Sequence, residues 1–415
     1  MRTIIFLDTM KSGSTREAIK AAEKLGYFTV LFTDNENFLR QRTEFSDVHR
    51  MTLVDFSNVE GLRNRIESYQ SQGLIIDAIV SFVDPYVYLA TKLHEEFCNR
   101  SLSINAIKAM EDKISTREIL KDSPYTPNFI KINGKESIKS LATKIKHYSY
   151  PLMVKSPFST GSKDVIKVEN IRELFNSVNL LKRKYPDLPI LIEEFLDGPQ
   201  YLVETVVVDG NIHIIAILEQ EITQYKRFII TGYNVVNKTE KALLQNIQQA
   251  VESIIKSFEM ETGTCHLEIR ITQGQCKLVE INPRISGGAM NRMIEIAYGI
   301  NLVEETLKIS LGSTPDLTRK WERPVFTQYV TIPSSGILEK VTGKTVASHL
   351  PGVQEVYVKP RKGSLLTPPN SMGQRYAYII ATGDSSEHAK ENAKTAAKEI
   401  QFHLKPIKKD KKKKL

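Results

Sequence analysis

The sequence predicts a mixed protein with an α/β N-terminal lobe, an α+β middle region and a β-rich C-terminal lobe. In the first hundred residues, apolar strands alternate with helical stretches. After residue 111, short strands rich in Val and Ile are separated by turns that contain glycine. A chain of 415 residues also exceeds the size at which a single hydrophobic core keeps growing, so we expect several cores.

The composition is that of an ordinary globular protein, with 41% hydrophobic and 25% charged residues. The formal net charge is +9, of which the lysine-rich stretch from residue 405 to 415 supplies +6. We interpret this stretch as a solvated tail, because no aromatic residue lies between the lysines to stack on bases. We therefore expect no nucleic-acid partner.

Cysteine usage and hydropathy indicate the compartment. Cys98, Cys265 and Cys276 show no paired spacing, which favours a reducing environment over a disulfide framework. The apolar run from Ile4 to Leu7 is too short for the core of a signal peptide. No segment approaches the roughly 18 apolar residues of a membrane-spanning helix. We expect a cytoplasmic protein without a membrane partner.

The first lobe, residues 1–110, reads as successive βαβ units. The expected elements are strands at Thr3–Leu7, Phe28–Phe32 and Ala78–Phe82, and a helix through Ala18–Leu25. This order favours a parallel sheet, in which ligands bind at the carboxyl ends of the strands. The turn Lys11–Thr15 therefore either approaches an anion at a helix N-terminus, or Ser14 or Thr15 simply caps the helix.

Two further lobes follow, at residues 111–315 and 316–405, with the tail at 406–415 and a mobile subdomain at about 150–205. The middle lobe is expected to contain helices near Ile171–Lys184 and Glu240–Glu259. The last lobe is expected to contain strands at Phe326–Ile332, Gly336–Val341, Val353–Lys359 and Tyr376–Thr382 and a helix at Glu387–Phe402.

The most informative motif is a hairpin in which polar and apolar residues alternate. On its first strand, one face would carry His266, Glu268 and Arg270. On its second strand, one face would carry Leu278, Glu280 and Asn282. A three-residue loop at residues 273–275 would place Glu268 opposite Glu280 and His266 opposite Asn282, whereas a two-residue loop would separate the carboxylates onto opposite faces.

Facing carboxylates repel each other on a sheet, so the pair is explained most simply by a hard cation between them. Carboxylate and amide oxygens suit Mg²⁺, which takes phosphate oxygens as further ligands. We therefore predict Glu268, Glu280 and Asn282 as metal ligands. The alternative is an exposed polar face on an ordinary hairpin. Gly287 and Gly288 follow shortly afterwards and fit a close approach of the backbone to a ligand.

Two lysines and a small-residue loop are candidates for binding phosphates. Lys113 follows Asp112, and Lys155 ends an apolar strand. The loop after Lys155 includes Ser159, Thr160, Gly161 and Ser162, whose backbone N–H groups could face phosphate oxygens. Loops of this composition are mostly just loops, and the sequence contains no Walker-type phosphate loop.

A strand at residues 190–196 ends in two acids. Its last part comprises Glu193, Glu194, Phe195 and Leu196. We interpret these four residues as a hinge whose backbone contacts an adenine edge while an acid binds the ribose hydroxyls. The alternative is an acidic strand end in solvent.

These constellations, in this order, resemble the ATP-grasp superfamily, and within it the carboxylate–amine ligases that join two L-amino acids. The sharpest motifs are Glu268-Ile269-Arg270 and the stretch from Glu280 to Gly288. The resemblance implies an ATP-grasp fold, with a Rossmann-like pre-ATP-grasp lobe before the core. One departure is Gln200, which stands where a Glu is common, so the resemblance does not assign Gln200 to the site.

The resemblance also implies roles and cofactors. The cofactors would be ATP and Mg²⁺, with Mn²⁺ as a substitute. Lys113 and Lys155 would bind phosphates, and Arg284 would steady an acyl phosphate and its tetrahedral successor, so Arg284 and Lys155 are the predicted catalytic residues. The amino-acid pocket would involve Glu219, His266, Gly287 and Gly288.

The expected activity is the ATP-dependent coupling of an L-amino acid, through an acyl phosphate, to a second amino acid, giving a dipeptide. The partners would be small amino-acid substrates, and a homodimer is compatible with the resemblance. The alternatives are an ATP-grasp ligase or carboxylase that acts on another acid, or a nucleotide-binding scaffold without turnover. The set of Glu268, Glu280, Asn282 and Arg284 is intact, which speaks against the scaffold.

Overall fold

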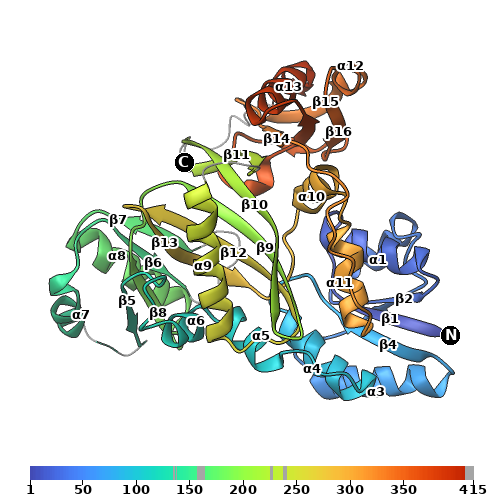
Figure 1. Cartoon of the computed structure of the whole chain (residues 1–415), viewed down its shortest axis with the longest axis horizontal. Helices are drawn as coiled ribbons and strands as arrows, with labels where there is room; N and C mark the ends of the chain where they lie inside the picture. The colour runs from blue at the N-terminus through green and yellow to red at the C-terminus, as the bar shows by residue number, and fades with distance from the viewer. Residues whose placement is uncertain (134–135, 137, 157–163, 225–227, 237–240, 407–415) are drawn as a thin grey trace, which may run out of the picture. The chain divides into compact units, whose positions relative to one another are not determined.

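The structure is a computed structural model of the whole chain, and it describes every residue except 134–135, 137, 157–163, 225–227, 237–240 and 407–415 (Figure 1). The chain forms two compact units. The first comprises Met1–Ile215, Glu240–Asn291 and Asn301–Leu317, and the second comprises Ala216–Thr239, Arg292–Ile300 and Thr318–Leu415. The division into lobes at residues 110, 315 and 405 follows different boundaries and stays a prediction.

The first unit begins with a parallel sheet of order β3-β2-β1-β4. Its elements are β1 (Arg2–Leu7), α1 (Ser14–Lys24), β2 (Phe28–Thr33), α2 (Glu36–Arg40), η1 (Arg42–Glu44), β3 (Arg50–Leu53), α3 (Val59–Ser71), β4 (Ile75–Val80) and α4 (Val87–Cys98). The expected parallel sheet is confirmed. The strand expected at Ala78–Phe82 is β4, which begins and ends earlier in the chain. A buried cluster that includes Phe32 and Ile66 fills the space between sheet and helices.

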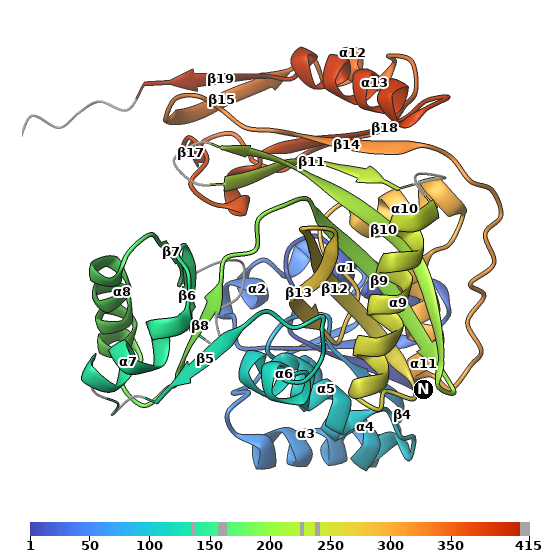
Figure 2. The same cartoon turned by 60° about the vertical axis from the view of Figure 1, so that its left-hand side comes forward.

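An antiparallel sheet of order β5-β8-β6-β7 forms the next part of the first unit (Figure 2). Its elements are β5 (Phe129–Ile132), α7 (Ile138–Lys144), η2 (Ile145–His147), β6 (Leu152–Lys155), β7 (Val165–Val168), α8 (Ile171–Lys184) and β8 (Ile190–Glu194). Leu174, Val178 and Leu181 of α8 pack on this sheet because they recur at helical spacing on one side of the helix. The helix predicted at Ile171–Lys184 is confirmed.

Three further antiparallel strands of the first unit, in the order β13-β12-β9, carry the predicted hairpin. The remaining elements here are α5 (Ile104–Glu111), α6 (Lys113–Ile119), β9 (Gln200–Val208), α9 (Lys241–Ser257), β12 (Gly263–Thr272), β13 (Gln275–Asn282) and α11 (Leu302–Ser310). Of the described helices between residues 111 and 315, the sequence predicted α8 and α9 but not α6, α7, α10 or α11. β10 (Asn211–Gln224) and α10 (Met290–Tyr298) pass from one unit to the other.

The second unit contains an antiparallel array in the order β10-β11-β14-β18-β16 and a small sheet in the order β17-β15-β19. Its other elements are β11 (Phe228–Val235), β14 (Val325–Val330), β15 (Gly336–Thr342), α12 (Lys344–Ser348), β16 (Val353–Val358), β17 (Leu365–Leu366), η3 (Met372–Gln374), β18 (Ala377–Thr382), α13 (Ser386–Glu399) and β19 (Gln401–Lys405). Alanines of α13, among them Ala389 and Ala393, pack with Phe326 of β14 and Ala381 of β18. The four predicted strands of this region are confirmed as β14, β15, β16 and β18.

The helix predicted at Glu387–Phe402 is wrong at its end. The helix stops at Glu399, Ile400 is extended, and β19 begins at Gln401 and pairs with β15. Phe402 and Leu404 alternate along β19 and pack beside a small core around Leu338 and Tyr376. This two-residue period fits a strand with one buried face.

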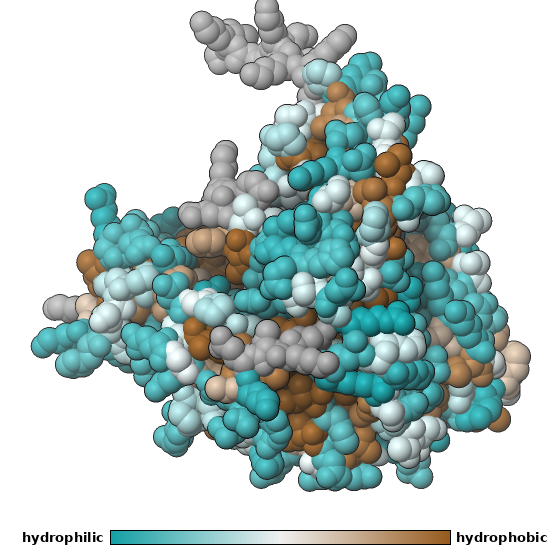
Figure 3. Space-filling model, turned by 45° about the horizontal axis from the view of Figure 1, so that its top comes forward, coloured by the Kyte–Doolittle hydropathy of each residue, from teal (hydrophilic) through white to brown (hydrophobic). Residues whose placement is uncertain are grey.

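The surface is mostly polar on the face that Figure 3 shows, with hydrophobic residues exposed in smaller patches, as is normal for a globular protein. Among the described residues, no helix combines the length and the apolar character needed to cross a membrane.

A test of packing in the second unit compares two glycines at positive φ. Gly343 has φ 85° and Gly363 has φ 87°, so alanine at either position pays the left-handed penalty of about 1–2 kcal/mol. At Gly343 an added Cβ would also lie 1.8 Å from the carbonyl oxygen of Glu399, whereas at Gly363 nothing lies within 4 Å.

We therefore expect Gly343→Ala to lower the free energy of unfolding by at least about 2 kcal/mol more than Gly363→Ala, because a backbone atom must shift. Chemical denaturation of the two variants and the parent chain measures the difference. Equal losses would contradict the close approach of residue 343 to the end of α13.

Candidate active site

The predicted hairpin is formed by β12 and β13, and its loop has two residues rather than three. Thr272 pairs with Gln275, and the loop residues Gln273 and Gly274 both have positive φ, at 50° and 78°. Positive φ at both positions is typical of a type I′ turn, whose twist matches that of the strands. The predicted three-residue loop is therefore wrong.

The predicted pairs nevertheless form, because β13 contains a bulge. His266 pairs with Asn282 and Glu268 with Glu280, but the register shifts between Glu268 and Ile269, and Ile269 pairs with Leu278. One extra residue, Val279, thus lies between the two pairs and reverses the parity that the short loop would impose. Leu278 consequently does not share the face of Glu280, contrary to the prediction, and it is fully buried.

The hairpin face that carries the carboxylates continues onto β9. Gln200 donates from Nε2 to Glu268 Oε2 at 2.7 Å and accepts from Arg270 Nε at 2.9 Å. Arg270 also donates to the carbonyl oxygen of Leu196 at 2.7 Å. Gln200 therefore orients Glu268 and links it to the predicted hinge. The sequence analysis left Gln200 out of the site, although Gln200 and Glu204 lie at even spacing on β9 and therefore share a face.

The residues present fit a divalent cation. The side chains of Glu268 and Glu280 keep 27% and 28% exposure, so both remain accessible to a ligand. Glu280 accepts from Lys113 Nζ at 3.1 Å. Although burial opposes the shift, the charges of His266, Lys113 and Lys155 lower the pKa of Glu268, which keeps it ionised at neutral pH.

Among the described residues, no group of three or more His, Cys, Asp or Glu side chains converges to enclose a metal ion. Two carboxylates and one amide alone would underfill a Mg²⁺ site, so further oxygens have to come from a ligand or water. That donor set suits a Mg²⁺–nucleotide complex better than a structural metal. The ligand assignment itself stays a prediction.

His266 lies between two acids and is buried. Its Nδ1 contacts Glu204 Oε1 at 2.5 Å, and its Nε2 lies 3.9 Å from Glu268 Oε1. Burial opposes protonation, but the two carboxylates outweigh it and raise the pKa of His266 to about 10. The charged imidazole therefore stabilises the ionised carboxylate of Glu268. A substrate role for His266 stays a prediction.

Glu204 also fixes the loop that follows β13 and the predicted metal ligands. Its second oxygen accepts from the N–H of Ser286 at 3.1 Å. The carbonyl oxygen of Ser286 accepts from Ser14 Oγ and, at 2.9 Å, from Asn291 Nδ2. Gly287 and Gly288, predicted to approach a substrate, are exposed directly after this anchor. Ser14 thus binds the loop rather than capping α1, whose N-cap is Gly13 without a side-chain cap. Of the two alternatives for the turn Lys11–Thr15, helix capping by Ser14 or Thr15 is therefore wrong, and the approach of an anion stays a prediction.

The predicted phosphate lysines come from two elements. Lys113 begins α6, where Asp112 caps the helix by accepting from the N–H groups of Ile114 and Ser115. Lys155 ends β6, is largely buried, and donates to Glu193 Oε2 at 2.5 Å. The other oxygen of Glu193 accepts from Arg117 Nε at 2.6 Å.

The predicted hinge lies at the end of β8, and both of its acids have protein partners. Glu193 is buried between Arg117 and Lys155. Glu194 accepts from the backbone N–H and the side-chain amide of Asn128, at 2.9 and 3.1 Å. The ring of Phe195 contacts two cations, with Lys167 Nζ 4.4 Å and Arg270 Cζ 5.9 Å from its centroid. A ribose contact by either acid stays a prediction.

Arg284 forms a bidentate ion pair with Asp84, with Nε at 3.0 Å from both carboxylate oxygens. It also donates to the carbonyl oxygen of Ile285 at 3.1 Å. A guanidinium has five N–H donors, so these partners leave capacity for an anionic ligand. The sequence did not predict Asp84, which lies in the loop after β4, because no local pattern connects it with Arg284.

Glu111 is a second acid near this ion pair. Burial raises the pKa of Glu111 from 4.5 to about 7; Asp84 adds to the rise, while the Tyr88 N–H and Arg284 oppose it. Perturbed carboxyls of this kind cluster at functional sites, although structural ion-pair networks produce them too.

Two further groups of predicted residues stay predictions. Ser159, Thr160, Gly161 and Ser162 fall outside the described residues. Glu219 belongs to the second unit, on β10 opposite Asn234, and its predicted substrate role is untested.

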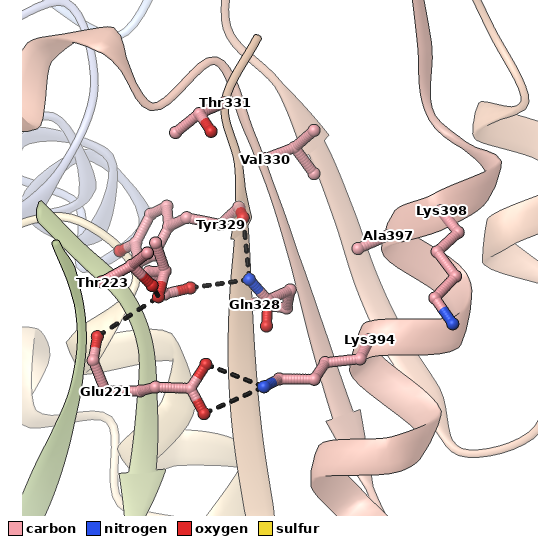
Figure 4. Close-up of a pocket in the computed structure, with 10 residues that line it drawn as sticks. Glu221, Thr223, Gln328, Tyr329, Val330, Thr331, Lys394, Ala397 and Lys398 are labelled. Atoms are coloured by element: carbon pink, nitrogen blue, oxygen red, sulfur yellow. Dashed lines mark hydrogen bonds and ion pairs between the residues drawn. The ribbon is translucent and has the colours of Figure 1, made fainter. Parts of the chain in front are cut away.

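The second unit has a pocket of its own, of about 400 Å³, between β10, β11, β14 and α13 (Figure 4). Glu221 lies at its edge and pairs with Lys394 at 2.8 Å and with Lys390. Gln328 donates to the carbonyl oxygens of Thr231 and Tyr329, both at 2.9 Å. None of the residues predicted for catalysis lines this pocket.

Two family models match this chain. Residues 148–292 match the ATP-grasp domain, and residues 328–405 match the L-amino acid ligase C-terminal domain 2. The first match includes Lys155, the hinge, Glu268, Glu280 and Arg284.

Similar proteins are distant in sequence and close in fold. The L-arginine-specific L-amino acid ligase of Bacillus subtilis is 23% identical over 305 residues, which are 71% of this chain and 72% of that protein. The L-amino acid ligase of Bacillus licheniformis matches in structure with a TM-score of 0.82 at 20% identity, covering 98% of this chain and 99% of that chain.

A third similar protein has a different chemistry. It is the biotin carboxylase domain of the 2-oxoglutarate carboxylase of Hydrogenobacter thermophilus, solved with MgADP, ADP and bicarbonate. Its TM-score is 0.70 at 16% identity, and the match covers 97% of this chain and 91% of that chain. The shared fold therefore accommodates different acids.

The fold is the ATP-grasp fold, and the chain carries an ATP-grasp domain at residues 148–292. Within that class it resembles the L-amino acid ligases. The comparisons support an ATP-dependent carboxylate–amine ligase, and they leave the acid and the amine to be identified.

Glu111 provides a test of the electrostatics near Arg284. Because the folded state raises the pKa of Glu111 from 4.5 to about 7, the stability that this group contributes is fully present below pH 4.5 and is lost as the pH rises through 7. Glu111→Gln cannot ionise, so its melting temperature should exceed that of the parent chain at about pH 8 and match it at about pH 4.5.

Thermal melts across this pH range measure the effect. Glu118→Gln, an exposed position on the adjacent helix α6, is the control and should follow the parent chain at every pH. A constant difference between Glu111→Gln and the parent chain would show that Glu111 titrates normally.

Proposed function

We propose that the protein is an ATP-dependent ligase that activates an L-amino acid as an acyl phosphate and couples it to a second L-amino acid. The observation that carries the proposal is the set of charges on the β9–β12–β13 face. Glu268 faces Glu280, Lys113 contacts Glu280, and Lys155 lies on the neighbouring sheet. The match of residues 328–405 to an L-amino acid ligase domain supports amino acids as substrates.

In this proposal, Glu268, Glu280 and Asn282 would hold Mg²⁺, and the bound ion would neutralise part of the negative charge of the phosphates. Lys113 and Lys155 contribute positive charge on the phosphate side, where phosphoryl transfer depends mainly on positioning and charge stabilisation. Arg117 and Lys155 together carry one positive charge more than Glu193 neutralises, so this buried pair of cations favours an anion nearby.

The substrate carboxylate would attack the γ-phosphorus of ATP, forming an acyl phosphate and releasing ADP. The amine would then attack the carbonyl carbon, lose a proton and expel phosphate. Arg284 would stabilise the oxyanion that develops in this second step, as a fixed donor that needs no reorganisation. Asp84 holds the guanidinium in one orientation for that role.

A second candidate is an ATP-grasp ligase or carboxylase that uses another acid. The similarity to a biotin carboxylase domain favours keeping it. The two candidates differ in which added compound stimulates the release of ADP.

The direct test measures ADP and phosphate release from ATP and Mg²⁺ with single and paired L-amino acids, together with mass spectrometry of the products. We expect ADP to form with particular pairs, together with the mass of a dipeptide. If no amino acid stimulates the release of ADP, amino acids are not the substrates, and the second candidate, with another class of acid, would replace the first.

A variant tests the metal face. Glu268→Gln keeps the shape of the side chain but removes the charge, so we expect turnover to fall by about 100-fold or more while the fold persists. Glu339→Gln changes an exposed glutamate on β15 and is the control, with turnover like that of the parent chain. Normal turnover in Glu268→Gln would remove Glu268 from the site.

A further inference from the structure

Arg117 is a buried arginine that no pattern in the sequence predicted. Its side chain is 2% exposed and spans two elements. Nε donates to Glu193 Oε1 on β8 at 2.6 Å, and Nη2 donates to the carbonyl oxygen of Val279 on β13 at 2.8 Å. Arg117 lies one helical turn after Lys113 on α6, so both project from one side of the helix.

Val279 is the extra residue of the β13 bulge. If β13 continued without a bulge, the two-residue loop would place Val279 opposite Glu268 and turn Glu280 to the other face of the hairpin. A bulge leaves backbone groups out of the ladder, and buried backbone groups require partners. Arg117 supplies the partner for the carbonyl of Val279, and the N–H of Leu278 donates to Tyr125 O at 2.7 Å.

Through Nε, Arg117 is linked to Lys155, because both donate to the carboxylate of Glu193. The Glu193 carboxylate is 2% exposed and receives Arg117 on one oxygen and Lys155 on the other. Although burial opposes ionisation, these two cations lower the pKa of Glu193 to about 2, so the carboxylate stays charged. Lys155 is thereby held by a carboxylate whose own position Arg117 fixes.

We propose that Arg117 is a positioning residue that sets both sides of the nucleotide site at once. It fixes Glu280 opposite Glu268 through the Val279 carbonyl, and it fixes Lys155 through Glu193. A planar guanidinium carries its donors on separate nitrogens in fixed directions, so it can bridge β8 and β13, whereas the three N–H donors of a lysine lie on one nitrogen. The inference rests on the proposed function for the identity of the ligands, Mg²⁺ and ADP.

The test uses the full chain with Arg117→Lys, which keeps the positive charge beside Glu193 but cannot also reach Val279. Two quantities are measured: the Mg²⁺ concentration that gives half-maximal ADP formation, and the rise in melting temperature that Mg²⁺ with ADP produces. We expect the half-maximal Mg²⁺ concentration to rise by about 10- to 100-fold, as for other residues that orient metal ligands, and the MgADP-induced rise to shrink.

The matched control is Arg16→Lys. Arg16 is also a buried arginine with a carboxylate partner, Asp47, but it lies on α1 and contacts neither the hairpin nor β8. We expect Arg16→Lys to lower the melting temperature without ligand and to leave the Mg²⁺ dependence unchanged. If Arg117→Lys behaves like this control, its role is structural only and the proposal is overturned.

Arg117→Gln is the second variant if Arg117→Lys does not yield a folded chain. Glu193 then keeps Lys155 as a partner, so no unpaired charge is buried, while the amide can reach only one of the two acceptors. Because the melting assay needs only Mg²⁺ and ADP, it still decides the role of Arg117 if amino acids fail to stimulate turnover. A lack of stimulation by amino acids would contradict the proposed substrates and would leave the proposed role of Arg117 untouched.

Discussion

The buried carboxylate of Glu193 is the constraint on which the site depends. A charge removed from water has to be paired, and here the pairing draws Arg117 from α6 and Lys155 from β6 to the end of β8. Because Arg117 also binds β13, one charge fixes the relative positions of two sheets within the first unit. The predicted phosphate lysine Lys155 and the strand that carries the predicted metal ligands are therefore parts of one hydrogen-bonded network.

A second chain of polar contacts supports the face that carries Glu268 and Glu280. Glu204 holds His266 and the N–H of Ser286, while Gln200 holds Glu268 and Arg270. Each of these side chains is at least half-buried, so each contact replaces water that the group has lost. The face open to a ligand is built from acids, whereas the residues that orient them are buried below it.

Sequence periodicity predicted much of this arrangement, but it could not predict all of it. Period-two alternation identified the hairpin and the pairing of Glu268 with Glu280, since side-chain direction on a strand is a local property. The reason given for the pairing was wrong, because a short loop and a bulge produce the same parity as a longer loop. A bulge depends on tertiary partners such as Arg117, which local spacing does not encode.

The same limit applies to Asp84 and to the end of α13. Asp84 meets Arg284 across 200 positions of sequence, so no motif joins them. The residues after Glu399 could continue a helix by propensity, but packing of Phe402 against the small sheet selects a strand. Where the partner is distant in sequence, the three-dimensional contact decides the conformation.

The bulge at Val279 has a consequence for comparing relatives. Before it, even-numbered residues of β13 such as Cys276 and Leu278 are buried, and after it the buried residue is the odd-numbered Ile281. A homologue whose hairpin lacks the extra residue would need a one-residue gap inside the strand rather than in the loop. An alignment that confines gaps to loops would shift either the turn or the acidic positions by one, and an intact pair of facing carboxylates would then be misread as substituted.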